Sequence, residues 1–399
     1  MKAKSGLTRF SNCFVLRNGR IVKEDLWVRN GKFENPEDIF YLEQVDADIT
    51  VYCDNNLIAP GFIDIQVNGG WGIDFSYDTE NVAAGVRKVA KELIAHGVTS
   101  FCPTLVTSDK EKYSQILPNI KKTPGGKHGA TILGLHLEGP FINSEKKGAH
   151  SEEFIKVPDK GLQSLIDMYG SLDHVSIVTL APELNGALEA TKALYERGIR
   201  VALGHSTASL AKGEEAIKSG ANIITHLFNA MLPFHHRDPG LVGLLASSTE
   251  RQVYYGIISD GIHTHPAALK IACRTNPEGL VLVSDAVPAQ GLTDGEYTIG
   301  PKAVRVKNSQ AYLTGTNTLC GSTTALDACI KTFKESTGCT IEYALEAASL
   351  HPAKALGIET RKGTLNFSSD ADFVVLDRNT LQVQQTWIAG QHNSNCSSS

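Results

Sequence analysis

Short apolar runs and helix-like segments alternate along most of this chain, from Gly61 onward. Eight of the apolar runs are long enough to be buried strands, at residues 62–68, 98–105, 131–138, 175–182, 200–206, 222–228, 254–260 and 280–286. The segments 81–97 and 187–198 between them end in glycine, a common stop signal for helices. Eight strand–helix repeats predict an α/β fold, a (β/α)8 barrel of the TIM type.

An open doubly wound sheet is the structural alternative to a barrel. No G-x-G-x-x-G turn follows the first strand, which disfavours a dinucleotide-binding fold of that kind.

Both ends of the chain are rich in β-strand signals. Two Asn-Gly turns, at Asn18-Gly19 and Asn30-Gly31, are typical of tight hairpins. We expect residues 1–57 and 358–399 to form one composite small β domain, a β-sandwich beside a barrel of residues 58–357. Two separate β appendages are the alternative. The polar tail "HNSNCSSS" is expected to be disordered.

Composition narrows the classes of function and location. The 399 residues carry a formal net charge of −5, which argues against broad nucleic-acid or membrane-surface binding. The eight cysteines form no C-x-x-C pair, and the first residues lack the apolar core of a secretory signal. No apolar run approaches the length of a membrane span. We therefore expect a cytoplasmic protein with reduced thiols.

Polar residues stand at the ends of several of the predicted strands, where a barrel of this type carries its active site. Glu138 ends "LHLE", His205 lies in "LGHS" and His226 in "ITHLF". Taken singly, each is better read as a rim residue or a satisfied core histidine. Together they converge on the barrel axis and form a suitable ligand set for one divalent ion, with Zn²⁺ the leading candidate.

Two further strand ends bear on the chemistry. Asp285 in "LVSDA" could be a helix N-cap, but beside three metal ligands we interpret it as the general base and acid acting on water. The first strand ends in Gln66 and Asn68, where a two-metal site of the His-x-His type would have histidines. These amides are expected to be polar, metal-free neighbours of a single ion.

Six motifs carry a family resemblance that spans about residues 57–376. The motifs are "APGFIDIQVNGGWGIDF", "GLHLEGPFINSEKKGAH", "ALGHSTAS", "THLFNAMLPFHHRDPGLVG", "GIISDGIHTHP" and "LVSDAVPAQG". In order and spacing they resemble the N-acetylglucosamine-6-phosphate deacetylase family of the amidohydrolase superfamily. The resemblance implies metal-dependent hydrolysis of the N-acetyl group of N-acetylglucosamine 6-phosphate, a small-molecule amino-sugar substrate, to glucosamine 6-phosphate and acetate.

The resemblance also implies roles for individual residues. Glu138, His205 and His226 match metal ligands, Asp285 matches the catalytic acid and base, and His150 matches a histidine that polarises the acetamide carbonyl. Arg237 and His263 match a phosphate-binding pair that can reach across the interface of a homodimer. The remaining substrate-binding matches are Ala149, Asn229, Ala230, Leu319, Cys320 and Gly321.

Two other functions compete with this interpretation. A cyclic-amide hydrolase of the same superfamily would use His-x-His and a carboxylated lysine, but the fourth strand, "VSIVTLAPE", offers no lysine. A non-catalytic oligomeric interaction protein would be expected to lose a ligand or the last-strand aspartate, and all four residues are present.

Overall fold

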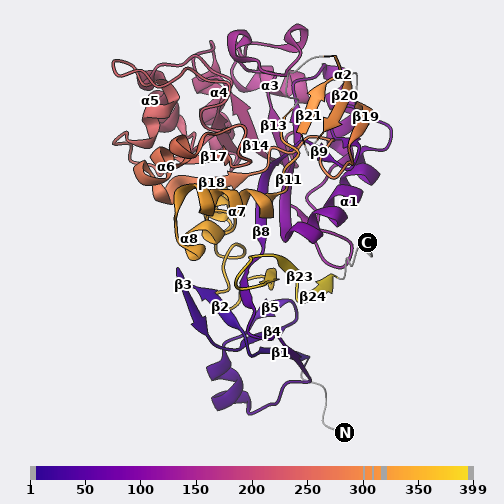
Figure 1. Ribbon diagram of the computed structural model, residues 1–399. Helices are drawn as coiled ribbons and strands as arrows, with labels where there is room; N and C mark the ends of the chain where they lie inside the picture. Colours follow the sequence, from indigo (N-terminus) through magenta and orange to yellow (C-terminus); the bar gives the residue numbers. More distant parts are fainter. Residues whose placement is uncertain (1–5, 300–301, 308–309, 316–320, 394–399) are drawn as a thin grey trace.

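The computed structural model describes residues 6–299, 302–307, 310–315 and 321–393. A large barrel lies above a smaller group of sheets in Figure 1, and β8 runs upward from the smaller group into the barrel. The tail expected to be disordered covers residues 392–399. Its first two residues, His392 and Asn393, form the end of strand β24 (Gln391–Asn393), which corrects the expectation there, and 394–399 lies outside the described residues. No helix in the described part of the chain is long and apolar enough to cross a membrane.

Eight parallel strands form the barrel, as the alternation in the sequence predicts. They pair in the order β8, β11, β13, β14, β15, β16, β17 and β18, and β12 also pairs with β11. Their bounds are β8 (Phe62–Val67), β11 (Val98–Val106), β12 (Thr131–Ile132), β13 (Leu135–Glu138), β14 (Val175–Leu180), β15 (Arg200–Leu203), β16 (Ile223–Ile224), β17 (Tyr254–Ile258) and β18 (Leu280–Val283). The barrel prediction is confirmed.

Side chains fill the barrel interior, so it is a packed core and not a channel. Branched residues such as Ile63, Ile177 and Val281 meet there in one buried cluster. Ala353 and Ala355 of α9 (Leu350–Leu356) belong to the same cluster, so this helix packs against the amino-terminal end of the strands. The opposite end of the barrel, formed by the carboxyl ends of the strands, stays open for a functional site.

The seam between β8 and β18 has no regular ladder. A bridge joins Val67 to Ala286, and the buried Asp64 carboxylate accepts the Ser284 N–H at 3.3 Å. The Ser284 hydroxyl in turn approaches the Gln66 carbonyl at 3.5 Å. Polar side chains therefore close the barrel where strand pairing is incomplete.

Helices surround the barrel, and α9 closes its amino-terminal end. They are α1 (Val82–Glu92), α2 (Lys110–Ile116), α3 (Leu162–Tyr169), α4 (Ala187–Glu196), α5 (Leu210–Ser219), α6 (Pro266–Thr275), α7 (Leu326–Thr337), α8 (Ile341–Glu346) and α9. Gly97 and Gly198 follow the two helical segments picked out in the sequence, and both have a φ of 75°. These left-handed positions are where glycine ends a helix at little steric cost.

Two further sheets lie at the lower end of the molecule (Figure 1). One has the order β5-β4-β1-β6 and the other the order β24-β23-β22-β7-β2-β3. Their strands are β1 (Leu7–Ser11), β2 (Phe14–Arg17), β3 (Arg20–Lys23), β4 (Leu26–Arg29), β5 (Lys32–Phe33), β6 (Ile49–Tyr52), β7 (Leu57–Pro60), β22 (Phe373–Leu376), β23 (Val383–Ile388) and β24 (Gln391–Asn393). Both Asn-Gly hairpins are present, pairing Arg17 with Arg20 and Arg29 with Lys32.

Four details differ from the sequence-based prediction. The strand expected at 131–138 breaks at Gly134, whose φ is 124°, and the strand expected at 222–228 is short because the chain turns at His226. An antiparallel sheet of β19 (Gly295–Ile299), β20 (Lys302–Lys307) and β21 (Gln310–Leu313) follows the last barrel strand and was not expected. A small pair, β9 (Gly69–Gly70) and β10 (Ile73–Asp74), follows β8.

Candidate metal and catalytic site

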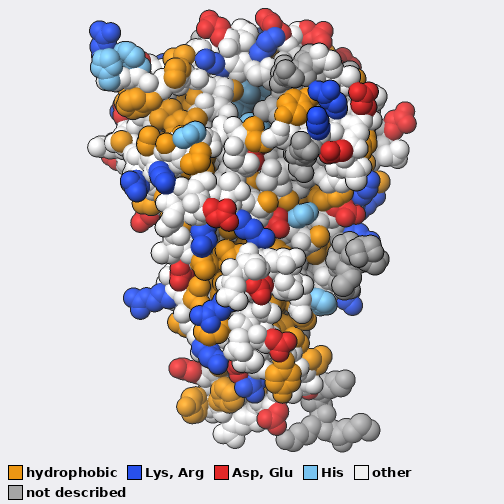
Figure 2. Space-filling view, viewed as in Figure 1, with side chains coloured by type: hydrophobic (Ala, Val, Ile, Leu, Met, Phe, Trp, Pro, Cys, Tyr) orange, Lys and Arg blue, Asp and Glu red, His pale blue; other side chains and the backbone are white. Residues whose placement is uncertain are grey.

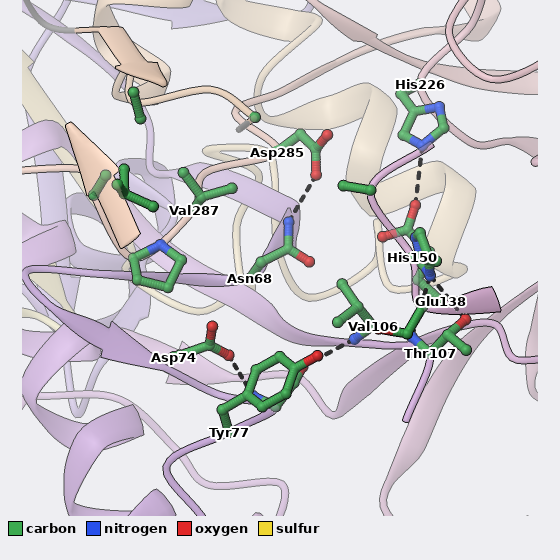
Figure 3. A pocket seen from close by; sticks show the side chains of 18 of the residues that line it. Asn68, Asp74, Tyr77, Val106, Thr107, Glu138, His150, His226, Asp285 and Val287 are labelled. Carbon is green, nitrogen blue, oxygen red and sulfur yellow. Dashed lines mark hydrogen bonds and ion pairs between the residues drawn. The ribbon is translucent and has the colours of Figure 1, made fainter. Parts of the chain in front are cut away.

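A cavity of about 190 Å³ opens at the carboxyl ends of the barrel strands. Its polar side chains include Glu138, His150, His205, His226 and Asp285, which come from different strand ends and loops. Figure 3 shows Glu138 beside His226 and His150, with Asp285 and Asn68 across the pocket. The convergence expected from the sequence is therefore present.

Glu138 stands at the centre of a tight group of donors and acceptors. Its Oε1 lies 3.1 Å from His205 Nε2 and 3.0 Å from His226 Nε2, and the two nitrogens are 3.1 Å apart. All three side chains are buried. Three ligand-type atoms this close together match what a divalent ion requires when it binds each of them at about 2.0–2.2 Å.

The hydrogen bonding of His205 shows that its Nε2, the ring nitrogen that faces Glu138, carries a free lone pair. Its Nδ1 lies 2.8 Å from the Lys146 carbonyl, which can only accept, so Nδ1 carries the proton of the neutral ring. The Nε2 lone pair then faces the Glu138 carboxylate. Two electron-rich atoms facing each other in a buried site need a cation or proton between them, so the residues fit a metal ion.

His150 also reaches this group. Ligand atoms of Glu138, His150 and His205 lie within 4.8 Å of one another, so four side chains compete for the three ligand positions expected. Thr107 donates its backbone N–H to His150 Nδ1 at 3.2 Å, and the Thr107 hydroxyl lies 2.8 Å from the same nitrogen. The proton of a neutral His150 is therefore held on Nε2.

The backbone at the strand ends is in an uncommon conformation. His205, His226 and Asp285 have φ values of 48°, 25° and 47°. Positive φ is rare for residues other than glycine, and strained positions of this kind cluster at functional sites. Here the sharp turn directly after each strand directs the side chain over the mouth of the barrel.

The two amides of the first strand bond to the carboxylates of the site. Gln66 Nε2 donates to Glu138 Oε1 at 3.0 Å. Asn68 Nδ2 donates to Asp285 Oδ1 at 2.8 Å, as Figure 3 shows. Glu138 ends β13 and Asp285 follows β18, so each amide serves a carboxylate from a different strand.

Burial and neighbouring charges tune the ionisable groups. Burial raises the pKa of Asp285 to about 7, and the negative charge of Glu138 adds to this effect. Burial also opposes ionisation of Glu138, but the adjacent imidazoles of His205 and His226 outweigh it and hold its pKa well below its usual range. One carboxyl group is thus firmly ionised while the other exchanges a proton near neutral pH, a division suited to acid–base chemistry.

The other residues singled out in the sequence lie in several places. Ala149 and Gly321 line the pocket. Asn229 and Ala230 lie three and four residues after His226 and do not line the pocket. The Ala230 carbonyl accepts the Ser206 N–H at 3.1 Å. His263 bonds Asp260 at 2.6 Å, and Arg237 is exposed in a loop away from the pocket of its own chain. Leu319 and Cys320 lie outside the described residues.

Sequence reasoning missed one wall of the pocket. Val287, Pro288 and Ala289, which begin two residues after Asp285, line it together with Val304 of β20 and Ala311 of β21. The first three could have been found by their position after Asp285. The strands of the inserted sheet carry no chemical signal, because apolar residues there look like any small β-sheet.

Comparison with known proteins agrees with this geometry. Residues 57–393 match the amidohydrolase family. The chain is 55% identical to an N-acetylglucosamine-6-phosphate deacetylase of Danio rerio, covering 96% of both chains.

Two solved structures are similar over nearly the whole chain. A deacetylase of the same name from Pasteurella multocida has a TM-score of 0.85 at 27% identity and covers 98% of this chain and 100% of its own. A variant of the enzyme from Mycobacterium smegmatis, in complex with N-acetyl-D-glucosamine-6-phosphate, has a TM-score of 0.82 at 30% identity and covers 98% and 99%. This chain belongs to the amidohydrolase family and, within it, to the N-acetylglucosamine-6-phosphate deacetylases.

Proposed function

We propose that this protein hydrolyses the acetamide of N-acetylglucosamine 6-phosphate, releasing acetate and glucosamine 6-phosphate. The observation that carries the proposal is the meeting of Glu138, His205 and His226 in one pocket with Asp285. In a member of this family, that arrangement supplies a metal-ligand set and a titratable carboxyl group at one reaction centre.

We propose that Glu138, His205 and His226 hold one divalent ion per chain, most simply Zn²⁺. The set of one carboxylate and two imidazoles supports this assignment, as does the inward lone pair of His205. His150 is left out because its Nδ1 is already engaged by Thr107. A divalent ion at this place would polarise the amide carbonyl and make water more acidic.

Asp285 is proposed to take the proton of the attacking water and to return it to the departing amine. Its pKa of about 7 without a bound cation fits a group that must do both, and a cation nearby would favour its ionised form. Asn68 fixes the orientation of its carboxylate. His150, with its proton on Nε2, can donate to the carbonyl oxygen as negative charge develops there, a contribution worth about 3–4 kcal/mol for one donor.

Ala149 and Gly321 are proposed to contact the sugar, with Asn229, Ala230, Leu319 and Cys320 as further substrate contacts. The backbone at Gly321 has a φ of 93°, and an added Cβ would lie 2.4 Å from Val287 Cγ1, so only glycine fits beside the wall of the pocket. A side chain here would push that wall into the substrate space.

We propose that His263 and Arg237 bind the phosphate, with Arg237 supplied by a second copy in a homodimer. The Asp260 hydrogen bond outweighs burial and raises the pKa of His263, which keeps the imidazole cationic over a wider pH range. Arg237 is exposed and absent from the pocket of its own chain, as a residue that serves a partner would be. A guanidinium is well suited to a phosphate oxygen pair.

The two chain ends are proposed to form one composite β-sandwich domain, residues 1–57 and 358–399, beside the 58–357 barrel. A hydrophobic cluster that includes Phe10, Val15, Phe33 and Phe373 joins the two chain ends and supports one composite unit. The pairing of β22 with β7 extends this unit to residues 58–60, three residues past the proposed boundary. A cytoplasmic location is supported by the described cysteines, which are all free thiols.

Acetate release tests the function directly. The metal-loaded protein is expected to release acetate from N-acetylglucosamine 6-phosphate and to act much less on the unphosphorylated sugar, because the phosphate anchors the substrate. A metal-loaded sample that releases no acetate would refute the proposal. Turnover of a cyclic amide in its place would favour the competing hydrolase.

A further inference from the structure

A second cavity, of about 680 Å³, lies between the barrel and the end sheets. Ser176 and Arg200, at the starts of β14 and β15, line it from the barrel. Lys32 and Ala389 line it from the end sheets, and Lys362 lines it from the segment that joins the two parts. Because the strands enter the barrel here, this cavity lies at the end opposite the metal and catalytic site.

The walls of this cavity carry excess positive charge. Five cations line it, Lys32, Lys122, Arg200, Arg361 and Lys362, against two carboxylates, Asp370 and Asp372. The chain as a whole has a net charge of −5, and acidic and basic side chains are interspersed over the face seen in Figure 2. The cavity therefore differs in charge from the rest of the molecule.

The two carboxylates hold three of the cations in place. Asp370 pairs with Lys32 and, at 2.9 Å, with Arg361, while Lys362 pairs with Asp372 and lies 3.4 Å from Asp370. Lys362 is buried, so its pair with Asp372 is held inside the protein, whereas Lys32 and Arg361 are partly exposed and pair with Asp370 nearer the surface. Because two carboxylates pair with three cations, the network keeps a net positive charge.

The other two cations have no acidic partner. Lys122 makes no hydrogen bond or ion pair within the described residues. Its side chain lies against Gly134, where an added Cβ would be 2.7 Å from the Lys122 Cε. Arg200 donates Nε to the Leu356 carbonyl, and its Nη2 lies against Gly357. The rest of its guanidinium has no anion among the described residues, so both cations are available to a ligand.

We propose that this cavity binds a small anion through a phosphate group, held by Lys122 and Arg200. A guanidinium and a flexible ammonium together match the oxygens of a phosphate. The volume is within the range of small-molecule sites and leaves room for an organic moiety beside the phosphate. Such a ligand would bridge the barrel and the end sheets, and the site works independently of the chemistry at the other end of the barrel.

Calorimetric titration of the full, metal-loaded chain with inorganic phosphate and, separately, ribose 5-phosphate tests the site. Lys122→Glu and Arg200→Gln are the test variants, and Lys121→Glu is the matched control, because Lys121 is the exposed neighbour that does not line the cavity. Binding of phosphate at the catalytic end of the barrel is expected to have the same affinity in all three variants. Tighter binding of ribose 5-phosphate would identify the ligand as an organic phosphate, and tighter binding of inorganic phosphate as the free ion.

One binding event is expected to weaken by at least about tenfold in both test variants, and binding to Lys121→Glu is expected to stay unchanged. Acetate release is expected to stay the same in Lys122→Glu, which shows that the variant is folded. If Lys122→Glu and Lys121→Glu bind both probes with equal affinity and stoichiometry, the cavity is not a phosphate site.

Discussion

Gln66 and Asn68 occupy the positions where a related two-metal site would carry histidines. Each amide donates to a carboxylate, Gln66 to Glu138 and Asn68 to Asp285. A neutral amide is a weak metal ligand but a good orienting donor. At the scale of single residues, the first strand therefore favours one well-oriented ion over two.

Replacing Asn68 by alanine tests this orienting role. Without the amide donor, the Asp285 carboxylate loses its fixed orientation and a bond that favours its ionised form, so we expect kcat to fall about 10- to 100-fold. Metal content is expected to stay the same, since Asn68 touches no proposed ligand.

The matched control is Asn119→Ala, an exposed residue on the surface of the barrel. Steady-state acetate release and metal analysis of the same samples are the measurements. A kcat equal to that of the control would show that Asn68 does not position Asp285.

The identity of the clustered residues could be predicted from the sequence because strand-end Glu138, His205 and His226 are unusual in buried strands. Their geometry could not, because the positive φ values of His205, His226 and Asp285 depend on packing around the turns. The approach of His150 was known only from the family resemblance, since its loop position carries no periodic signal.

Among the secondary-structure elements, the parallel strands bring the site together, because their carboxyl ends all lie at the same end of the barrel. Hydrophobic runs and glycine stops made these strands predictable. The inserted sheet β19–β20–β21 was not predictable as a pocket wall, because antiparallel pairing between nearby segments gives no sign of what the sheet will cover. The seam between β8 and β18 was not predictable either, because it is closed partly by the buried side chain of Asp64, which no sequence pattern marks.

Asp64 makes stability depend on pH at that seam. Burial raises its pKa to about 7, and its Oδ2 has no hydrogen-bond partner among the described residues. The folded chain therefore binds a proton more tightly than the unfolded chain does. Its contribution to stability is complete below the unfolded pKa, near 4, and is lost as pH rises towards about 7, by about 1.4 kcal/mol per pH unit.

Asp64→Asn is expected to flatten this dependence. The asparagine Oδ1 can still accept the Gln66 and Ser284 N–H groups, and no charge has to be buried. Denaturant unfolding of metal-depleted samples between pH 5 and 7.5 measures the slope, with the exposed Asp167→Asn as control. Equal slopes for the two variants would show that Asp64 does not titrate in this range.

In the whole molecule, one residue proposed to bind the substrate phosphate, Arg237, does not line the pocket of its own chain. Arg237 projects from an exposed loop. A homodimer in which each copy lends this arginine to the other would complete both sites, as two-fold symmetry requires.

Co-expression of Arg237→Ala with Glu138→Gln tests this sharing. Each variant alone is expected to be nearly inactive, but a mixed dimer contains one site with both Glu138 and Arg237 intact. Random pairing in equal amounts should restore about a quarter of the sites. Acetate release from the purified mixture, compared with the two variants mixed after separate purification, gives the readout. No recovery from the co-expressed pair would mean that Arg237 acts within its own chain or not at all.

We propose that Glu138 joins His205 and His226 to hold a metal ion that the reaction needs. The most direct test measures metal content and acetate release together in Glu138→Gln, with Glu145→Gln as the control from the exposed loop that follows. We expect one divalent ion per chain and full turnover in the control, and loss of most of the ion with at least about a 100-fold fall in turnover in Glu138→Gln. Undiminished metal content and turnover in Glu138→Gln would contradict the account.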